Sequence, residues 1–375
     1  MTDMPINVAI LGCSKIARLH ARAIGQIPEF RLQAAWSRTP ESAQKFAEEF
    51  ALKTYHSIPE MIQNEQIQLA IVCTAHPYHA MPAIEAMEAG SHVMIEKPLA
   101  STLQDCDKII ETAKKTGRKV GVISQRRWYQ PIIRMKEAID SGKIGTPMLG
   151  TIQLFGWRDR SYFENESWRG KWATEGGGIL VNQSPHQLDI LQWLMGDVDE
   201  VFGYWSNINH PYIEVDDTAV AIVRFKSGAL GNIVMSNSQK PGIYGKVHIH
   251  GSNGASVGAQ IEGGSMFLPG KTKIAAAPQL DIWTITGEEK LIEDWNRADS
   301  GEFHAVDPMT WYFRKQYEDF AAAILTNRQP LVTAEDGRKT VELFTAIYRS
   351  QRDRRPVKFP LNPEYDRGDL DGRIN

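Results

Sequence analysis

The first 124 residues alternate between short apolar runs and longer helical patterns, and this alternation restricts the possible folds more than any other feature. The apolar runs are typical of buried strands and lie at residues 6–11, 32–36, 69–73, 92–95 and 120–123. Helical patterns separate them, at residues 14–27, 41–50, 80–89 and 103–115. Strands that alternate with helices in this way predict an α/β domain with a doubly wound parallel sheet.

The pattern changes after residue 124, where strand-like segments follow one another with few helices between them. These segments lie at residues 148–155, 200–205, 217–225, 230–236 and 246–250. Two of them flank the turn Lys226-Ser227-Gly228, which is typical of a hairpin. Helical patterns lie at residues 130–141, 312–325 and 334–352. This half of the chain predicts a mostly antiparallel sheet with a few helices.

Composition restricts the partners and the location of the chain. Its 375 residues carry a formal net charge of -3, with 42% hydrophobic and 23% charged residues, as in soluble globular proteins. This charge gives no reason to expect nucleic acid, and no apolar run has the length of a membrane span. The scattered Cys13, Cys73 and Cys106 form neither a disulfide framework nor a zinc pattern. We therefore expect a cytoplasmic protein without a metal ion.

The turn after the first strand has the position of a phosphate-binding loop. Gly12-Cys13-Ser14-Lys15-Ile16-Ala17 follows a strand and opens a helix, as the dinucleotide-binding fingerprint does. Only the first glycine of the fingerprint is present, and an ordinary strand–helix turn is the alternative. The candidates for cofactor contacts here are Gly12, Ser14, Lys15 and Ile16.

The end of the second strand bears on the choice of cofactor. An acidic residue there normally binds the ribose hydroxyls of NAD, but this chain has Ser37 and Arg38. A hydroxyl and a guanidinium suit a 2′-phosphate, so the sequence favours NADP, with NAD as the alternative.

A histidine lies at a well-marked helix start, in the run Asn182-Gln183-Ser184-Pro185-His186-Gln187-Leu188-Asp189. We expect Ser184 as the N-cap, Pro185 at the first helical position and Gln187 as its partner in a capping box. His186 then lies in the first turn, where the helix dipole favours a neutral ring that accepts a proton from an alcohol. A histidine that only satisfies nearby backbone groups is the alternative.

A lysine follows another strand directly, in the tripeptide Glu96-Lys97-Pro98. Parallel sheets bind ligands at the carboxyl ends of their strands, so Lys97 is expected to reach a nicotinamide ring or a substrate hydroxyl. The alternative is a surface turn.

Taken together, these residues resemble the Gfo/Idh/MocA oxidoreductase family over nearly the whole chain. The resemblance rests on the Gly12 turn, Cys73-Thr74 followed by His79, Ala89-Gly90-Ser91-His92-Val93 leading into Glu96-Lys97-Pro98, and Gly176-Gly177-Gly178 leading into His186 and Asp189. It implies a Rossmann dinucleotide-binding domain at residues 1–124. It also implies a substrate-binding and oligomerisation domain at residues 125–360, with a large open sheet and a homo-dimer or homo-tetramer. Residues 361–375 remain as a polar tail, either loosely held or an oligomer contact.

The resemblance also implies roles for single residues. Lys97 becomes the lysine near substrate and nicotinamide, and His186 the proton-transfer histidine, which Asp189 would orient. Asn182 departs from the family, because many members have aspartate there. An amide takes no proton but orients sugar hydroxyls, so the run resembles the branch of sugar 3-dehydrogenases. Further candidates for the cofactor site are Thr74, His76, His79 and Glu96, of which His76 stands where the family often has asparagine.

The remaining candidates for substrate contacts lie in the second domain. Arg126 and Tyr129 stand at its start, with a structural role as the alternative. One aromatic residue among Tyr162, Trp168 and Trp172 is expected to pack on the C–H face of a sugar, with a core or oligomer contact as the alternative.

The sequence thus predicts an NAD(P)-dependent oxidoreductase acting on a sugar, glycoside, nucleotide sugar or cyclitol. Hydride would pass between the nicotinamide and a secondary hydroxyl or ketone, C3 of a sugar being one candidate, while His186 carries the proton and Lys97 stabilises the oxygen. Two alternatives remain open. One is redox-neutral glycoside cleavage through transient C3 oxidation with bound NAD, and the other is a non-catalytic nicotinamide-binding sensor or regulatory protein.

Overall fold

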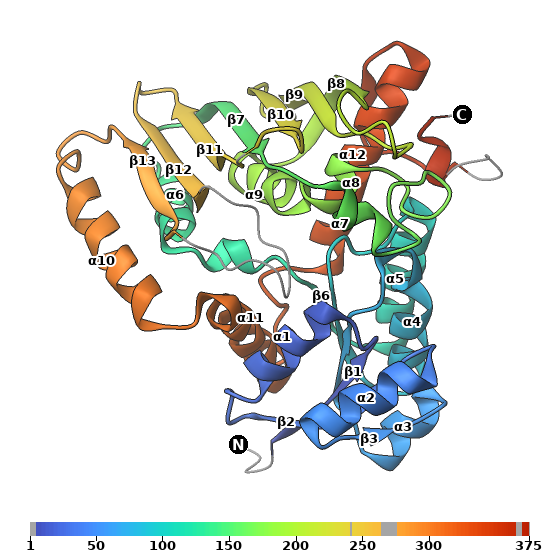
Figure 1. The fold of residues 1–375 in the computed structure, drawn as a ribbon. Helices are drawn as coiled ribbons and strands as arrows, with labels where there is room; N and C mark the ends of the chain where they lie inside the picture. The colour runs from blue at the N-terminus through green and yellow to red at the C-terminus, as the bar shows by residue number, and fades with distance from the viewer. Residues whose placement is uncertain (1–4, 241, 264–275, 365–369, 375) are drawn as a thin grey trace. The chain divides into compact units, whose positions relative to one another are not determined.

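The chain divides into two compact units in a computed structural model that describes residues 5–240, 242–263, 276–364 and 370–374 (Figure 1). The first unit contains Met1–Gln125 and Met309–Val341, and the second contains Arg126–Pro308 and Glu342–Asn375. The segment Met309–Val341 thus belongs to the N-terminal unit, although the predicted domain boundaries place it in the second domain.

The first unit is built on a parallel sheet of six strands in the order β3-β2-β1-β4-β5-β6. The strands are β1 (Ile6–Leu11), β2 (Phe30–Trp36), β3 (Lys53–Thr54), β4 (Leu69–Val72), β5 (His92–Ile95) and β6 (Val120–Val122). The chain starts in the middle of the sheet, runs outward to β3 and then returns to β4 on the other side of β1. This reversal confirms the predicted doubly wound sheet and creates the switch point at which such sheets bind ligands.

Helices connect these strands, and a later segment of the chain joins them. They are α1 (Lys15–Ile24), α2 (Pro40–Phe50), α3 (Ile58–Asn64), α4 (Ala80–Glu88), α5 (Leu103–Thr116) and α11 (Pro308–Leu325). Helix α5 has a defined cap at each end. The Thr102 hydroxyl accepts a hydrogen bond from the Asp105 amide at its N-terminus, and Gly117 adopts a left-handed conformation that ends the helix. Helix α11 packs closely on β6, where a Cβ atom on Gly121 would lie 2.9 Å from the Phe320 ring.

The second unit is built on a sheet of eight strands in the order β13-β12-β11-β7-β10-β9-β8-β14. The strands are β7 (Pro147–Phe155), β8 (Val198–Ser206), β9 (Thr218–Phe225), β10 (Leu230–Ser236), β11 (Tyr244–Gly251), β12 (Ser256–Gly263), β13 (Gln279–Trp283) and β14 (Val357–Lys358). Among the described strands of this second sheet, β7 and β10 pair in parallel and the other pairs are antiparallel, so the sheet is mostly antiparallel as predicted. The predicted hairpin joins β9 and β10.

The two faces of this sheet differ in exposure. The helices of the unit are α6 (Gln130–Asp140), α7 (Arg160–Glu164), α8 (Ile179–Asn182), α9 (Pro185–Met195), α10 (Leu291–Ala305) and the second part of α12 (Ala334–Asp353). Helix α9 packs so closely on β7 that a Cβ atom on Gly150 would lie 2.8 Å from the Met195 side chain. On the other face, apolar side chains of β8, β9 and β10 are exposed, among them Tyr204, Val220, Ile222 and Leu230.

The sequence patterns did not predict β12, β13 or α10. Strand β12 contains Gly258, which lacks a side chain where the His248 ring lies against it. Helix α10 buries only Asp299 and Phe303 and has no side-chain cap, so it leaves little apolar periodicity in the sequence.

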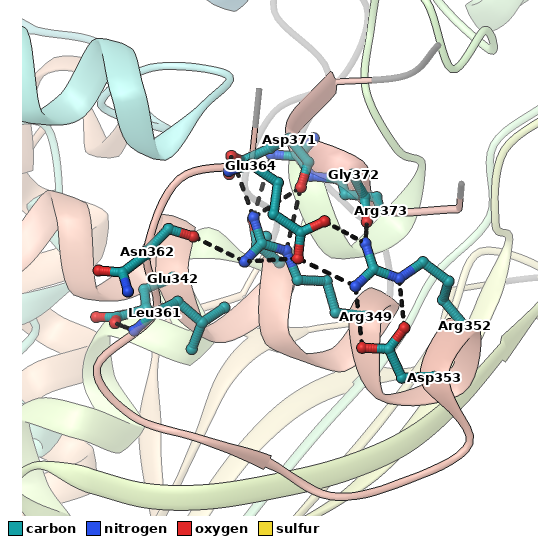
Figure 2. A network of polar contacts seen from close by, with 11 residues as sticks. Glu342, Arg349, Arg352, Asp353, Leu361, Asn362, Glu364, Asp371, Gly372 and Arg373 are labelled. Carbon is teal, nitrogen blue, oxygen red and sulfur yellow. Dashed lines mark hydrogen bonds and ion pairs between the residues drawn. The ribbon is translucent and has the colours of Figure 1, made fainter. Parts of the chain in front are cut away.

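The described part of the C-terminal tail is tied to α12 by arginines (Figure 2). Arg349 donates to the carbonyl oxygen of Asp371 at 2.8 and 3.1 Å, and to that of Asn362 at 2.9 Å. Arg352 holds both carboxylate oxygens of Glu364, at 2.7 and 3.0 Å. Such bidentate contacts fix geometry as well as charge.

Arg373 anchors the end of this tail inside the second unit. Its side chain is fully buried, and its guanidinium lies 5.0 Å from the centroid of the Phe344 ring and donates to the carbonyl oxygen of Gly176. A loosely held tail is therefore wrong for the described residues, because buried hydrogen bonds hold it. Its alternative role as an oligomer contact stays a prediction.

No helix in the described part of the chain is long and apolar enough to cross a membrane.

Candidate active site

The turn after β1 leaves room for close approach of the backbone. Gly12 has a φ of +100°, and a Cβ atom on it would lie 2.5 Å from the backbone nitrogen of Thr74. The Ser14 hydroxyl donates to the carbonyl oxygen of Cys73 at 3.0 Å, so it braces the ends of β1 and β4. Lys15 and Ile16 follow in the first turn of α1, and Lys15 is exposed. The predicted phosphate loop thus lies at the switch point of the sheet.

The predicted cofactor residues after β2 and β4 meet at one place. The Arg38 guanidinium lies 3.6 Å from the centroid of the Tyr78 ring. Tyr78 ends the short 3-10 helix η1 (His76–Tyr78), and its carbonyl oxygen accepts a hydrogen bond of 2.9 Å from the Thr74 hydroxyl. Ser37 accepts a hydrogen bond from the Thr39 amide at 3.3 Å. Arg38 therefore lies against the loop that carries Thr74 and the buried His76.

His79 braces two loops at the carboxyl edge of the sheet. Its Nδ1 lies 2.9 Å from the carbonyl oxygen of Pro98, and its Nε2 lies 3.0 Å from that of Thr74. Burial lowers the pKa of His79, so the neutral ring donates to one of the two oxygens. These contacts favour a structural role for this residue.

Lys97 follows β5, and a chain of hydrogen bonds between buried polar side chains holds its backbone in place. The Glu96 carboxylate accepts a hydrogen bond from the Lys97 amide at 3.0 Å and lies 2.8 Å from Nε2 of His20. The Tyr317 hydroxyl lies 2.7 Å from Nδ1 of the same ring. The Lys97–Pro98 peptide bond is cis. Glu96, predicted to contact the cofactor, thus directs its carboxylate to His20 and to the backbone of Lys97.

His186 lies in the first turn of α9 as predicted, but the predicted capping box is wrong. The Ser184 side chain makes no cap bond, because it donates instead to the carbonyl oxygen of Leu180 at 2.5 Å. The short helix α8 turns into α9 there, and Ser184 has helical dihedral angles that do not suit an N-cap. The Gln187 side chain is buried without a hydrogen-bond partner in the described structure. His186 itself is buried, with a small exposed fraction.

Asp189, one turn after His186, forms a buried ion pair with Arg127. Both carboxylate oxygens accept hydrogen bonds from the guanidinium, at 2.5 and 2.9 Å. The same guanidinium lies 4.9 Å from the centroid of the Trp193 ring. This pair fixes α9 to the start of the second unit. A role for Asp189 in orienting His186 stays a prediction.

Asn182 is held by a carboxylate that the sequence did not single out. Its amide donates to Glu175 at 2.5 Å, and the other oxygen of Glu175 accepts from the Gly170 amide at 2.5 Å. Burial raises the pKa of Glu175 to about 7, although the Arg169 charge and these hydrogen bonds oppose it. A proton-binding carboxyl group thus stands next to the amide that departs from the family pattern.

The glycine run before α8 is explained by close backbone packing. A Cβ atom on Gly178 would lie 1.8 Å from the carbonyl oxygen of Asp216. The buried Asp216 carboxylate accepts hydrogen bonds from the Gly178 and Leu180 amides at 2.6 and 3.1 Å, and from the Tyr348 hydroxyl at 2.6 Å. Asp216 therefore caps the helix that carries Asn182.

The other predicted substrate residues have mixed surroundings. Tyr129 is buried and hydrogen-bonded to Arg126. Trp168 is half-buried beneath the Arg169 guanidinium, at 4.7 Å from ring centroid to guanidinium carbon. Trp172 is a core residue, because its ring lies 4.9 Å from that of Trp205 and its indole N–H donates to the carbonyl oxygen of Glu214.

The structure thus brings the candidates together within each unit. In the first unit they line the carboxyl edge of the sheet, and in the second they cluster around α8 and α9.

Sequence reasoning missed the supporting residues His20, Tyr317, Arg127, Glu175 and Asp216. The sequence signal that could have indicated such residues is a charged or polar residue that stands alone within an apolar helical pattern, or one that lies beside the run Gly176-Gly177-Gly178. Among the described residues, no group of three or more His, Cys, Asp or Glu side chains is arranged to hold a metal ion.

Comparison with known proteins identifies the family. Residues 6–124 match the oxidoreductase family described as an NAD-binding Rossmann fold, and residues 136–359 match its C-terminal alpha/beta domain. The chain belongs to the Gfo/Idh/MocA oxidoreductase family, as its motifs predicted. It is an oxidoreductase with an NAD-binding domain, which confirms the prediction of a dehydrogenase.

Individual relatives resemble the chain over almost its whole length. Myo-inositol 2-dehydrogenase from Thermotoga maritima is 25% identical over 369 residues, which cover 94% of this chain and 98% of the relative. The scyllo-inositol 2-dehydrogenase (NAD(+)) of Bacillus subtilis is 25% identical over 96% of this chain and 98% of its own. The crystal structure of the WlbA dehydrogenase from Bordetella pertussis, in complex with NADH and UDP-GlcNAcA, has a TM-score of 0.85 and 26% identity. It covers 96% of this chain and 100% of its own.

Proposed function

We propose that the protein is an NAD(P)-dependent dehydrogenase that acts on a secondary hydroxyl group of a sugar, nucleotide sugar or cyclitol. The observation that carries this proposal is that a chain of this family has both a lysine at the carboxyl end of β5, in the first unit, and a histidine in the first turn of α9, in the second unit. Relatives named for inositols and a structure with a bound nucleotide sugar support the substrate class. Oxidation at C3 of a sugar is the finer proposal, and it rests on Asn182.

His186 and Lys97 divide the chemistry of the hydroxyl group between them. His186 accepts the hydroxyl proton as hydride leaves the carbinol carbon, and we assign the proton to Nε2 because Nδ1 is buried. Lys97 stabilises the negative charge that develops on the oxygen. The Glu96 carboxylate fixes the backbone of Lys97 through a hydrogen bond of 3.0 Å. In the direction of reduction, both roles reverse.

The loop after β1 fits a dinucleotide. Gly12 leaves no Cβ atom in the space beside Thr74, and the N-terminus of α1 follows at once, so backbone amides are available for a pyrophosphate. The nicotinamide supplies the hydride acceptor when it is bound. We propose a preference for NADP, because Arg38 and Ser37 replace the usual acid after β2.

The exposed apolar face of the second sheet supports a homo-oligomer. Side chains such as Tyr204, Val220 and Ile222 are exposed on neighbouring strands of a single chain. Monomers rarely leave such a surface uncovered, so we propose a homo-dimer or homo-tetramer formed through this face.

The proposed activity is tested with a panel of sugars, glycosides, cyclitols and nucleotide sugars, each offered with NAD and with NADP. Absorbance of the reduced cofactor at about 340 nm reports hydride transfer, and NMR of the product identifies the oxidised carbon. Reduction of the cofactor by at least one member supports the proposal. Cleavage of a glycoside without net reduction would favour the redox-neutral alternative. A cofactor that binds but is never reduced would favour a sensor.

A further inference from the structure

Three arginines gather in the second unit, close to the segment that carries Asn182 and His186. Arg126 lies at its start, Arg158 follows β7, and Arg169 lies in the loop between α7 and α8. Burial lowers the pKa of Arg126, and the charge of Arg158 lowers it further. Burial also lowers the pKa of Arg158, on which the charge of Arg169 acts in the same direction. The charge of Arg158 thus acts on Arg126, and that of Arg169 acts on Arg158. At least one side-chain nitrogen atom of each of the three arginines is buried.

Aromatic rings hold two of these guanidinium groups in position. Arg158 lies 5.1 Å and Arg169 lies 4.1 Å from the centroid of the Tyr162 ring. Arg169 also lies 4.7 Å from the centroid of the Trp168 ring. The Tyr162 hydroxyl accepts a hydrogen bond of 2.9 Å from Gln183, which directly follows Asn182. Tyr162, whose ring contacts both guanidinium groups, is thus joined to the end of α8.

The carboxylates nearby leave the cluster with positive charge. Asp159 is bound to the amide of Tyr162 and the hydroxyl of Ser161, at 2.9 and 2.8 Å, where it caps α7. Glu175 is occupied by Asn182 and Gly170, and its raised pKa of about 7 leaves it partly protonated near neutral pH.

Arg169 has donors that the described structure does not satisfy. Its Nε and Nη1 atoms are buried and meet no hydrogen-bond acceptor in the described part of the chain. Buried donors of a charged group are costly when they stay unpaired. Planar guanidinium groups bind the two oxygens of a carboxylate or phosphate especially well.

We propose that Arg126, Arg158 and Arg169 form a subsite for an anionic group of the substrate, either a carboxylate or a phosphate carried by the sugar. The inference rests on the proposed function and deepens it by selecting acidic or phosphorylated sugars over neutral ones. The hydrogen bond between Gln183 and Tyr162 joins this subsite to the segment of the second unit that carries Asn182 and His186.

The test compares matched substrates that differ in one group, such as glucose, glucuronate and glucose 6-phosphate, and a nucleotide sugar with and without a uronic carboxylate. The variants are Arg169→Gln and Arg126→Gln, with Arg169→Lys as a charge-conserving form. Arg160→Gln is the matched control, because Arg160 is exposed on α7 and pairs with Glu164.

We expect wild type and Arg160→Gln to prefer one anionic member of a set. Arg169→Gln should lower kcat/KM for that member by about 10- to 100-fold and leave the neutral member nearly unchanged. The preferred member distinguishes a carboxylate from a phosphate.

Equal turnover of neutral and anionic members by wild type would overturn the inference while leaving the proposed dehydrogenase intact, as would a parallel loss on both members in Arg169→Gln. If no sugar is oxidised, the proposed function fails and direct binding decides the inference. Calorimetric titration with glucuronate and with inorganic phosphate should then show binding that Arg169→Gln weakens and Arg169→Lys partly restores. Absence of binding to wild type would contradict it. Circular dichroism of each variant separates loss of the subsite from loss of the fold, and Arg126→Gln carries the test if Arg169→Gln does not fold.

Discussion

Glu96 and His20 form a buried hydrogen bond of 2.8 Å directly behind the backbone of Lys97. Burial alone would raise the pKa of Glu96, but the hydrogen bond and charge of His20 outweigh it, and the pKa is lowered. The ionised carboxylate therefore joins a helix of the Rossmann unit to the loop that presents the lysine. The position of Lys97 depends on residues that need not touch a substrate.

Replacing Glu96 with Gln should weaken this support. The carboxylate of Glu96 contacts His20 with one oxygen and the backbone N–H of Lys97 with the other, whereas a glutamine side chain has only one oxygen. One of the two hydrogen bonds is therefore lost, and we expect a loss of about 1–3 kcal/mol in the free energy of unfolding. We also expect a lower kcat with little change in the affinity for the cofactor, since the lysine would be less well fixed. Chemical denaturation and steady-state kinetics measure these effects. Glu88→Gln, at an exposed position at the end of α4, is the control and should behave as wild type.

Gly12→Ala should impair dinucleotide binding and stability more than Gly90→Ala. The two glycines have similar φ values, +100° and +106°, so an alanine at either position destabilises the folded state through its positive φ. Only Gly12 has a neighbour, the Thr74 nitrogen at 2.5 Å from the added Cβ atom, whereas nothing lies within 4 Å at Gly90. Thermal denaturation and cofactor titration by fluorescence compare the variants. Equal behaviour would show that the close approach of the β1 and β4 ends is unimportant.

Glu175 should make stability depend on pH. Its pKa is raised from 4.5 to about 7 in the folded protein, so the unfolded chain releases its proton first as the pH rises. Stability should therefore fall between about pH 4.5 and about pH 7, by up to about 3 kcal/mol, and level off above that range. Relative to Glu175→Gln, which has no proton to lose, wild type should lose stability across this window. The exposed Glu302→Gln should leave the slope unchanged. A stability difference that is constant with pH would refute the assignment.

Arg373→Ala should loosen the glycine run before α8. The side chain is fully buried and donates to the carbonyl oxygen of Gly176, so its removal leaves that group and a space unfilled. We expect a loss of about 2–4 kcal/mol in the free energy of unfolding, together with lower turnover. Arg355→Ala, at an exposed position after α12, is the control. Unaltered thermal denaturation of Arg373→Ala would mean that the tail does not contribute to the fold.

The parts of the fold that the sequence predicted are those with strong periodicity. Strands such as Leu69–Val72 are buried on both faces and therefore apolar throughout, and the helices between them keep a regular amphipathic pattern. The α8–α9 corner was not predictable in detail, because the Ser184 hydroxyl finds Leu180 only once the short helix α8 has formed. His20 and Tyr317 lie 297 positions apart in the chain and meet only through tertiary packing. Local patterns carry no signal for such pairs.

In the proposed reaction, His186 carries the proton and Lys97 stabilises the oxygen during NAD(P)-dependent oxidation of a sugar or cyclitol hydroxyl group. The most direct measurement is the rate of cofactor reduction at about 340 nm by wild type, His186→Ala and Lys97→Ala, with cofactor affinity measured in parallel. Both variants should bind the cofactor nearly as wild type does but turn over about 10²- to 10⁴-fold more slowly. Full activity of either variant on the substrate that wild type oxidises would contradict the account.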